Sequence, residues 1–404
     1  MFFYSIGIKI YLFIIYLASA FNKKASKAIK GRKDFFKINL PDSKQKYIWF
    51  HCASLGEFEQ GRPIIERIKK QNPEKKVLLS FFSPSGFEIR KDYSFADKIV
   101  YLPFDSASNA KKFLSIFSIE MAVFVKYDVW PFYMKEILKR KIPVFLTSAV
   151  FRKDQFFFKW YGAFFLKLLT RMNIIFVQNE ESISLAKSKR LNNAELAGDA
   201  RVDRVEQIKL NIQEIPSVKQ FIRKKKCIVL GSVYESETVF IKYLVEHLGE
   251  DFKIIIVPHS VDSSTLNHFK KVFPQAELFT NLNKKRECSV LLVDHVGSLN
   301  QIYQYASGVY VGGGYDKGIH NILEPAVFNI PIFFGSHYHK FPEAFSLLKE
   351  NLAFVENDSL QLAKCMVTKL KEDTSPEFFN NSKKWFKKNS GATDLIYSKL
   401  SRFF

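Results

Sequence analysis

The chain has 404 residues, of which 47% are hydrophobic and 25% are charged. This composition is that of a folded protein without a large disordered part, and the length favours two domains over one core. Lysine and arginine (61) outnumber aspartate and glutamate (40), for a formal net charge of +21, which favours an anionic partner such as a membrane surface, a nucleic acid or an acidic substrate. Because abundant lysine could equally reflect the coding bias of a genome, charge alone does not choose among these partners. The four cysteines form no CxxC pair, which argues against a disulfide framework and a cysteine zinc site.

The first 21 residues are nearly all apolar or aromatic, and Lys9 is the only charged side chain among them. A run of this length can cross a bilayer as a helix, and the basic cluster between Lys23 and Lys33 predicts that its C-terminal flank faces the cytoplasm. A cleaved signal peptide would carry its charge before the apolar run instead. Lys9 is also compatible with a helix lying in the membrane interface, and a terminal helix docked on the protein is a third interpretation. We expect residues 1–33 to be a membrane anchor with a basic flank.

After this flank, strand-like and helix-like segments alternate, as they do in parallel α/β sheets. Short apolar runs predict six strands in the first half of the chain, and the sixth is expected to be the last of that half. These predicted strands are residues 47–52, 76–82, 98–102, 121–126, 143–148 and 174–178. A polar segment from Arg201 to Arg223, which contains Pro216, then separates this set from a second one.

The second half repeats the alternation, with a helix predicted over residues 235–247. Its predicted strands are residues 226–230, 253–257, 290–294, 308–311 and 331–334. The expected fold class is α/β, with two doubly wound Rossmann-like domains facing a central cleft at the carboxyl ends of both sheets, where ligands bind in such folds. The predicted boundaries are 1–33 for the anchor, 34–205 for the N-terminal domain, 206–223 for a linker, 224–375 for the C-terminal domain and 376–404 for a helical segment.

The strand at 308–311 ends in three consecutive glycines, Gly312 to Gly314. A short helix is predicted to begin near Asn321 and to end at Asn329. Glycines between a strand and a helix let a ligand approach the backbone, where free N–H groups and the helix dipole favour an anion, and Glu324 could accept hydrogen bonds from sugar hydroxyls. This pattern is typical of a nucleotide-sugar site. A tight turn that needs glycine for purely steric reasons is the alternative.

A small-residue loop, His51 to Glu57, follows the first predicted strand. Pro63 is expected in the first turn of the next helix, which would leave Glu57 near the cleft. A carboxylate there could remove a proton from an acceptor hydroxyl as a general base. The alternative is that Glu57 caps a helix N-terminus. Asp128 follows another strand, just before Trp130, and fits either a cleft loop or an Asx-turn.

Two further strand ends carry polar groups in the second half. Gly231 and Ser232 close its first strand and suit either a phosphate or a simple turn. His259 closes the next strand and could donate to an anion or be a structural histidine. His337 and His339 alternate in a loop without a third ligand nearby, so no metal site is predicted.

Four motifs in this order and spacing make the chain resemble the 3-deoxy-D-manno-octulosonic acid (Kdo) transferases of lipopolysaccharide synthesis, and the resemblance extends over nearly the whole chain. They are Ala53–Glu57, Asp128–Pro131, Gly231-Ser232 and His320–Pro325. The resemblance implies a GT-B glycosyltransferase that transfers Kdo from CMP-Kdo to the lipid A precursor (lipid IVA) with inversion. It also implies a location on the cytoplasmic side of the bacterial inner membrane, an anionic membrane surface as partner, and no cofactor or metal, CMP-Kdo being a donor substrate.

The resemblance also implies residue roles. Glu57 matches the catalytic base, and Asp128 matches an acidic position on the acceptor side that could stabilise the transition state. Donor binding is assigned to Gly231, Ser232, His259, Gly313, Gly314, Asn321 and Glu324. The chain departs from the family pattern at Lys126, where an acidic residue is frequent, at Tyr234, where histidine is frequent, and before His259, where an arginine is missing.

Two other functions compete with this interpretation. A GT-B enzyme that uses another nucleotide sugar or another lipid acceptor would show much the same pattern. A nucleic-acid-binding protein is disfavoured because the lysines are dispersed over many helices and no known nucleic-acid motif is present.

Overall fold

The computed structural model describes residues 2–39, 42–282, 288–372 and 375–404, so small parts of the predicted anchor and of both predicted domains lie outside the described residues. The chain divides into two compact units. Unit 1 comprises Met1–Arg204 together with Asn389–Phe404, and unit 2 comprises Val205–Lys388.

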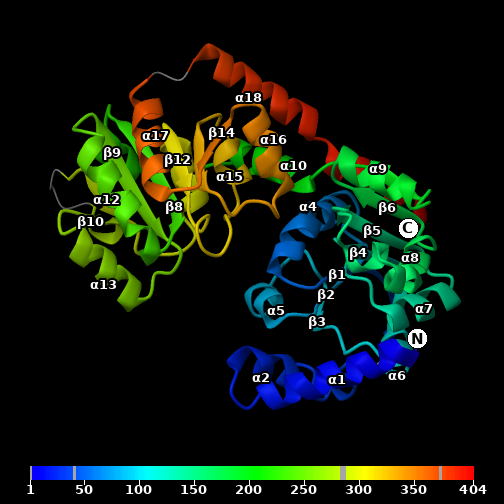
Figure 1. The fold of residues 1–404 in the computed structure, drawn as a ribbon. Coiled ribbons are helices and arrows are strands. Elements are labelled where there is room, and N and C mark those ends of the chain that lie inside the picture. The colour runs from blue at the N-terminus through cyan, green and yellow to red at the C-terminus, as the bar shows by residue number, and fades with distance from the viewer. Residues whose placement is uncertain (1, 40–41, 283–287, 373–374) are drawn as a thin grey trace. The chain divides into compact units, whose positions relative to one another are not determined.

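Unit 1 is built on a parallel seven-stranded sheet with the order β3-β2-β1-β4-β5-β6-β7 (Figure 1). Its strands are β1 (Asp42–Cys52), β2 (Lys76–Phe81), β3 (Lys98–Tyr101), β4 (Phe117–Val125), β5 (Val144–Ala149), β6 (Ile174–Val177) and β7 (Ala194–Leu196). The six predicted strands are confirmed, but the expectation that the sixth is the last is wrong. β7 pairs with β6, and its three residues, Ala-Glu-Leu, are too short and too polar to be recognised as a strand from an apolar run.

Helices cover both faces of this sheet, and successive residues of a strand pack into two different hydrophobic cores. In β1, Trp49 packs in one cluster, whereas Ile48 and Phe50 pack in the other, because neighbouring side chains of a strand point to opposite faces. The helices are α3 (Phe35–Ile38), α4 (Leu55–Gln71), α5 (Pro84–Arg90), α6 (Ala107–Ile116), α7 (Pro131–Lys139), α8 (Ala163–Leu169), α9 (Glu180–Ser188), α10 (Ala200–Leu210) and α19 (Ala392–Leu400).

Unit 2 repeats this architecture with the strand order β10-β11-β9-β8-β12-β13-β14. The strands are β8 (Lys226–Val233), β9 (Phe252–Pro258), β10 (Glu277–Leu278), β11 (Val290–Leu292), β12 (Gly308–Val311), β13 (Ile332–Gly335) and β14 (Ala353–Glu356). The five predicted strands are confirmed, and β10 and β14 were missed. The helices are α11 (Pro216–Ile222), α12 (Thr238–His247), α13 (Ser263–Val272), α14 (Leu299–Ile302), α15 (Leu323–Ala326), α16 (Pro342–Lys349), α17 (Ser359–Lys371) and α18 (Pro376–Asn389).

Near the centre of each sheet the chain order reverses, between β1 and β4 in unit 1 and between β8 and β12 in unit 2. Ligands of doubly wound sheets bind outside the carboxyl ends of the strands at such points. Two residues at these strand ends have left-handed backbones, Lys126 after β4 (φ 67°) and Ser232 near the end of β8 (φ 56°). Non-glycine residues adopt this conformation at a cost, and such residues are frequent at functional sites.

The predicted linker and C-terminal segment form regular helices. Residues 206–223 contain the end of α10 and all of α11. Within 376–404, α18 packs in unit 2, where the Trp385 indole donates to the Ser346 hydroxyl. The following α19 packs in unit 1, where Ile396 and Leu400 are fully buried beside α4.

The N-terminal segment forms α1 (Phe2–Ala18) and α2 (Lys23–Lys30), which lie along unit 1 (Figure 1). The Tyr11 ring stacks on Phe82, just after β2, and the Arg32 guanidinium donates to the carbonyl of Leu102, just after β3. Among the described residues, no single helix is long and apolar enough to cross a membrane. The helix pair Tyr4–Ala18 and Lys23–Ile38 meets that test together, by length and composition only, with a bend of 119°.

Candidate active site

Glu57 lies in the first turn of α4, at the carboxyl end of β1. Ser54 is the N-cap residue, and its hydroxyl donates to the Glu57 carboxylate. The prediction that Pro63 belongs to the first turn is wrong, because α4 begins at Leu55 and Pro63 lies in its interior. The helix continues through Pro63 because the neighbouring Ile64 and Ile65 are fully buried in the core, which offsets the lost backbone hydrogen bond.

Asp128 follows β4 and accepts two hydrogen bonds on one carboxylate oxygen. His51 Nε2 lies 2.8 Å from Asp128 Oδ2, and the Trp130 indole donates to the same oxygen over 3.0 Å. The His51 side chain is fully buried, whereas that of Asp128 is 26% exposed. Asp128 therefore connects the buried His51 side chain to the carboxyl edge of the sheet. Sequence reasoning missed His51, although a polar residue at the end of an otherwise apolar strand is a usable signal.

Several carboxylates lie near the carboxyl end of β1. Glu57 lies in the first turn after β1, β1 pairs with β4, and His51 of β1 contacts Asp128 just after β4, so both carboxylates lie at the carboxyl ends of two neighbouring strands. Burial raises the pKa of the Cys52 thiol, and the charges of Glu57, Asp128 and Glu59 raise it further. Glu59 is paired with Arg90 and Arg204. The structure thus brings the two predicted acidic residues of unit 1 to the same switch point.

In unit 2, a buried carboxylate joins the two loops at the switch point. Glu237 Oε2 accepts from the Tyr234 backbone N–H (2.8 Å), and Oε1 accepts from the Gly313 N–H (2.9 Å) and the Tyr310 hydroxyl (2.6 Å). Burial raises the pKa of Glu237, and these three hydrogen bonds oppose the rise. The sequence analysis did not single out Glu237, because its partners become neighbours only through the pairing of β8 with β12.

Three rings stack at the same edge of unit 2. The His259 ring lies 4.6 Å from both Tyr234 and His320, the Tyr234 hydroxyl lies 3.0 Å from His320 Nε2, and the Lys317 ammonium lies 4.5 Å from the Tyr234 ring centre. Burial, His259 and Lys317 lower the pKa of His320 to about 4, and burial and Lys317 lower that of His259. Both imidazoles are therefore neutral at pH 7, and Lys317 supplies the positive charge beside them. His320 and Lys317 were not among the predicted site residues.

The glycines that follow β12 have a steric reason to be glycine. Gly313 has a φ of 89°, and a Cβ on Gly314 would lie 2.4 Å from the backbone nitrogen of Gly335. A Cβ on Gly231 would lie 2.3 Å from the Tyr303 hydroxyl. Close backbone packing alone therefore accounts for these three predicted donor residues, which supports the steric alternative without excluding ligand contact.

The helix after the glycine loop differs from the prediction. It begins at Leu323 and ends at Ala326, so it has one turn, although Asn329 adopts the left-handed conformation expected beyond its end. One turn aligns too few peptide dipoles to attract an anion strongly. The expectation that the dipole of this helix favours an anion is therefore wrong. Asn321 instead orders the loop, because its Oδ1 accepts from the Leu323 N–H and its amide donates to Glu324 over 2.9 Å.

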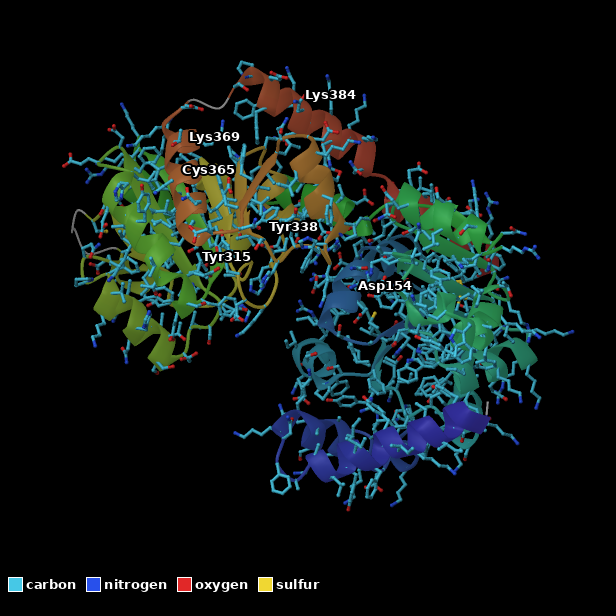
Figure 2. The ribbon with its side chains drawn as sticks, viewed as in Figure 1. Asp154, Tyr315, Tyr338, Cys365, Lys369 and Lys384 are labelled. Carbon is cyan, nitrogen blue, oxygen red and sulfur yellow. The ribbon has the colours of Figure 1, made fainter. Side chains whose placement is uncertain are left out.

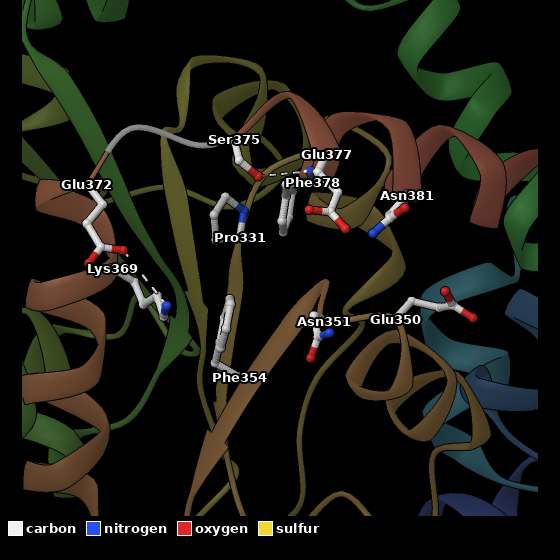
Figure 3. Close-up of a pocket in the computed structure, with 10 residues that line it drawn as sticks. All are labelled: Pro331, Glu350, Asn351, Phe354, Lys369, Glu372, Ser375, Glu377, Phe378 and Asn381. Atoms are coloured by element: carbon white, nitrogen blue, oxygen red, sulfur yellow. Dashed lines mark hydrogen bonds and ion pairs between the residues drawn. The ribbon is translucent and has the colours of Figure 1, made fainter.

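A pocket of about 260 Å³ lies elsewhere in unit 2 (Figure 3). It is lined by Pro331 and Asn351, which precede β13 and β14, and by Lys369 near the end of α17. Tyr315 and Tyr338, in contrast, belong to the loops after β12 and β13 (Figure 2). The pocket is therefore at the amino edge of the sheet, opposite to the predicted site residues. The described residues contain no group of three or more His, Cys, Asp and Glu that could hold a metal ion.

Solved structures with a similar fold support the architecture. The UDP-GlcNAc 2-epimerase of Neisseria meningitidis superposes with a TM-score of 0.61 at 15% sequence identity, covering 89% of this chain and 100% of that one. Two parallel seven-stranded α/β units with polar residues at their switch points define a fold of the GT-B type.

Sequence comparisons show which family the chain is similar to. The family described as 3-deoxy-D-manno-octulosonic-acid transferase (kdotransferase) matches residues 27–204. A protein of Aquifex aeolicus named 3-deoxy-D-manno-octulosonic acid transferase is 28% identical over 332 residues, covering 80% of this chain and 85% of that protein. A protein of Rickettsia bellii with the same name is 23% identical over 414 residues, covering 98% of this chain and 96% of that protein. The chain is therefore similar to the Kdo transferases over most of its length.

Proposed function

We propose that this glycosyltransferase moves Kdo from CMP-Kdo to the lipid A precursor, lipid IVA, with inversion at the anomeric carbon. The observation that carries the proposal is the placement of Glu57 and Asp128 at the switch point of unit 1 in a chain similar to this family. The acceptor hydroxyl oxygen bonds to the anomeric carbon as the bond from that carbon to the CMP phosphate oxygen breaks. Glu57 takes the hydroxyl proton, and CMP leaves with the bonding electron pair.

Asp128 serves the acceptor side in this proposal. Its Oδ2 is occupied by His51 and Trp130, and its partly exposed side chain leaves Oδ1 to accept from an acceptor hydroxyl or to stabilise positive charge on the sugar.

Unit 2 holds the donor in this proposal. Ser232 and Asn321 would donate to donor oxygens and Glu324 would accept from hydroxyls, while the backbones of Gly231, Gly313 and Gly314 form the floor of the site. The neutral His259 imidazole donates a hydrogen bond to the anionic donor, and Lys317 adds the positive charge that stabilises the departing phosphate.

The membrane partner is an anionic inner-membrane surface on the cytoplasmic side. The docked α1 leaves apolar side chains exposed along one face, among them Ile10 (55%), Phe13 (62%) and Leu17 (53%). Lysines of and beside α2, such as Lys24 and Lys30, are exposed as well. An exposed apolar helix face flanked by lysines is typical of a helix that lies in the interface of an anionic bilayer. Tyr11 of α1 stacks on Phe82, Phe82 stacks on Trp130, and the Trp130 indole donates to Asp128, so α1 lies close to the acceptor residues, where a lipid acceptor would enter.

The test measures transfer of radiolabelled Kdo from freshly generated CMP-Kdo to a tetra-acylated lipid A precursor. The wild type is expected to transfer, and Glu57→Gln, which still accepts from Ser54, is expected to lose about a hundredfold or more of the rate. Glu74→Gln changes an exposed glutamate of the same unit and is the control. Unimpaired transfer by Glu57→Gln would remove Glu57 from the role of base. If the wild type fails with CMP-Kdo but consumes another nucleotide sugar or uses another lipid acceptor, the substrate assignment is wrong.

A further inference from the structure

A buried chain of hydrogen bonds runs behind Asp128, from β1 and β2 to the site. The Trp49 indole donates to the Ser80 hydroxyl over 2.8 Å, and the same hydroxyl lies 2.8 Å from His51 Nδ1. His51 Nε2 lies 2.8 Å from Asp128 Oδ2. Trp49, Ser80 and His51 are all fully buried, and the pairing of β1 with β2 sets His51 directly beside Ser80.

The chemistry of these groups fixes the direction of each hydrogen bond. An indole N–H can only donate, so Ser80 Oγ accepts from Trp49. Among the described residues, His51 Nδ1 is the one acceptor within reach of the Ser80 proton, and a buried hydroxyl proton without an acceptor destabilises the fold. Ser80 therefore donates to Nδ1. The neutral imidazole then carries its proton on Nε2, which points at Asp128. The Trp130 indole N–H lies 3.0 Å from both His51 Nε2 and Asp128 Oδ2. Because a protonated Nε2 cannot accept, this indole donates to the carboxylate.

The Asp128 carboxylate is held on one side only. Oδ2 accepts from His51 Nε2 and from the Trp130 indole, whereas Oδ1 has no partner among the described residues. Trp130 is itself fixed by stacking on Phe82 at 4.7 Å. Two donors on Oδ2 orient the carboxylate plane, so Oδ1 is the atom presented to a ligand.

We propose that His51 is a positioning residue for the transfer reaction, which holds Asp128 through a neutral Nε2–H imidazole whose tautomer is fixed by Ser80 and Trp49. The role of Asp128 toward the acceptor rests on the proposed function, whereas the tautomer of His51 does not. A serine that fixes the tautomer of an imidazole, which in turn orients a carboxylate, follows the logic of outer-shell partners in other sites.

The kinetic test compares His51→Phe, which keeps an aromatic ring among Trp49, Phe124 and Trp130, with His51→Gln, which can still donate to Asp128. His51→Phe is expected to lower kcat/KM for the lipid acceptor about tenfold to a hundredfold, with KM for the sugar donor unchanged. His51→Gln is expected to recover part of that loss. Equal losses in both variants would overturn the proposal.

A double-mutant cycle separates positioning from general support of the fold. If His51 acts through Asp128, His51→Phe will have almost no further effect in an Asp128→Ala background. A loss of the same factor in both backgrounds would mean that His51 supports the fold, and the proposal would fail.

Nitrogen-15 NMR of the full chain labelled at histidine tests the tautomer without any transferase activity. The resonances that His51→Gln removes are expected to report a protonated Nε2 and an unprotonated Nδ1, and Ser80→Ala is expected to mix the two tautomers. A proton on Nδ1 in the wild type would overturn the inference. If the tautomer is as expected while Kdo transfer is absent, the positioning geometry stands and the proposed reaction is wrong.

Discussion

At the scale of single residues, Glu237 shows how one buried carboxylate can set the shape of a site that it does not face. Its two oxygens accept from two backbone N–H groups of the loops after β8 and β12 and from the hydroxyl of Tyr310 in β12. A carboxylate is the one common side chain that can accept all three without offering a proton. These hydrogen bonds hold the backbones of Tyr234 and Gly313 to the same carboxylate. The Tyr234 ring in turn stacks with His259 and His320.

Glu237→Gln is expected to weaken the binding of CMP about fivefold to a hundredfold, because the amide offers N–H donors to a backbone N–H that needs an acceptor. Calorimetric titration with CMP measures this loss, and Glu235→Gln, an exposed neighbour, is the control. Unchanged affinity in a folded Glu237→Gln variant would contradict the assigned role.

Asp105 makes the free energy of unfolding depend on pH. Its buried carboxylate accepts from the Tyr4 hydroxyl and the Phe132 and Tyr133 N–H groups, and burial raises its pKa to about 6 from an ordinary value of 3.8. Between these two values the folded state binds more protons than the unfolded state. The free energy of unfolding therefore falls as pH rises through this window.

The expected contribution of this group is on the order of 3 kcal/mol, lost between about pH 4 and pH 6. Asp105→Asn should lack it, so the stability difference between variant and wild type should shift in favour of the variant as pH rises. Denaturant unfolding across pH 4 to 7.5 measures the difference, with Asp92→Asn, an exposed aspartate of the same unit, as the control. A difference that does not change with pH would show that Asp105 has an ordinary pKa.

At the scale of elements, the basic segment after α1 has two different uses. Arg32 points inward, where it lies over the rings of Phe82, Tyr101 and Phe104 at 4.4–5.1 Å from their centres. It also donates to three backbone carbonyls. Burial lowers its pKa to about 10, so it stays charged at neutral pH. Arg32 thus holds the helix pair on unit 1, while the exposed lysines remain available to a membrane.

Replacing the apolar face of α1 tests its use. Phe13→Ser combined with Leu17→Ser is expected to reduce binding to vesicles with anionic lipid by at least tenfold, because each exposed side chain contributes about 1.5–3 kcal/mol when it is buried in lipid. Co-sedimentation measures binding, and Leu210→Ser, which changes an exposed leucine of unit 2, is the control. Equal binding by all variants would mean that α1 does not contact lipid.

At the scale of the whole molecule, the chain returns to unit 1 at its end. The residues from Asn389 onward belong to that unit, and Asp203 accepts hydrogen bonds from the N–H groups of Gly391 and Thr393. The core of unit 1 is therefore completed by α19, which follows unit 2 in the chain, although the seven strands of the unit 1 sheet all precede residue 200.

Ile396→Ala should lower the stability of unit 1 by about 2–5 kcal/mol, because it removes a fully buried side chain and leaves a cavity. Urea unfolding can be followed by tryptophan fluorescence, since Trp49, Trp130 and Trp160 lie in unit 1 and Trp385 in unit 2. CMP binding by unit 2 should be unaffected. Leu395→Ala, at a side chain 37% exposed, is the control, and an equal effect of both changes would contradict the placement of α19 in this core.

The sequence by itself determined the elements whose signal is local. The apolar runs of β1 to β6 and of the five main strands of unit 2 are largely buried, so their composition alone marked them. It also determined that Glu57 and Asp128 follow strands, because small residues and a proline end those strands.

Only the tertiary structure decided what depends on distant partners. β7, β10 and β14 are two to four residues long and are strands because a neighbouring strand offers its hydrogen bonds. Helix α4 continues through Pro63 because the core holds it. The pairing of His51 with Asp128, the carboxylate bridge of Glu237, the stack of His259 on His320 and the return of α19 to unit 1 all join residues far apart in sequence. Strand register and packing create these contacts, and no local pattern encodes them.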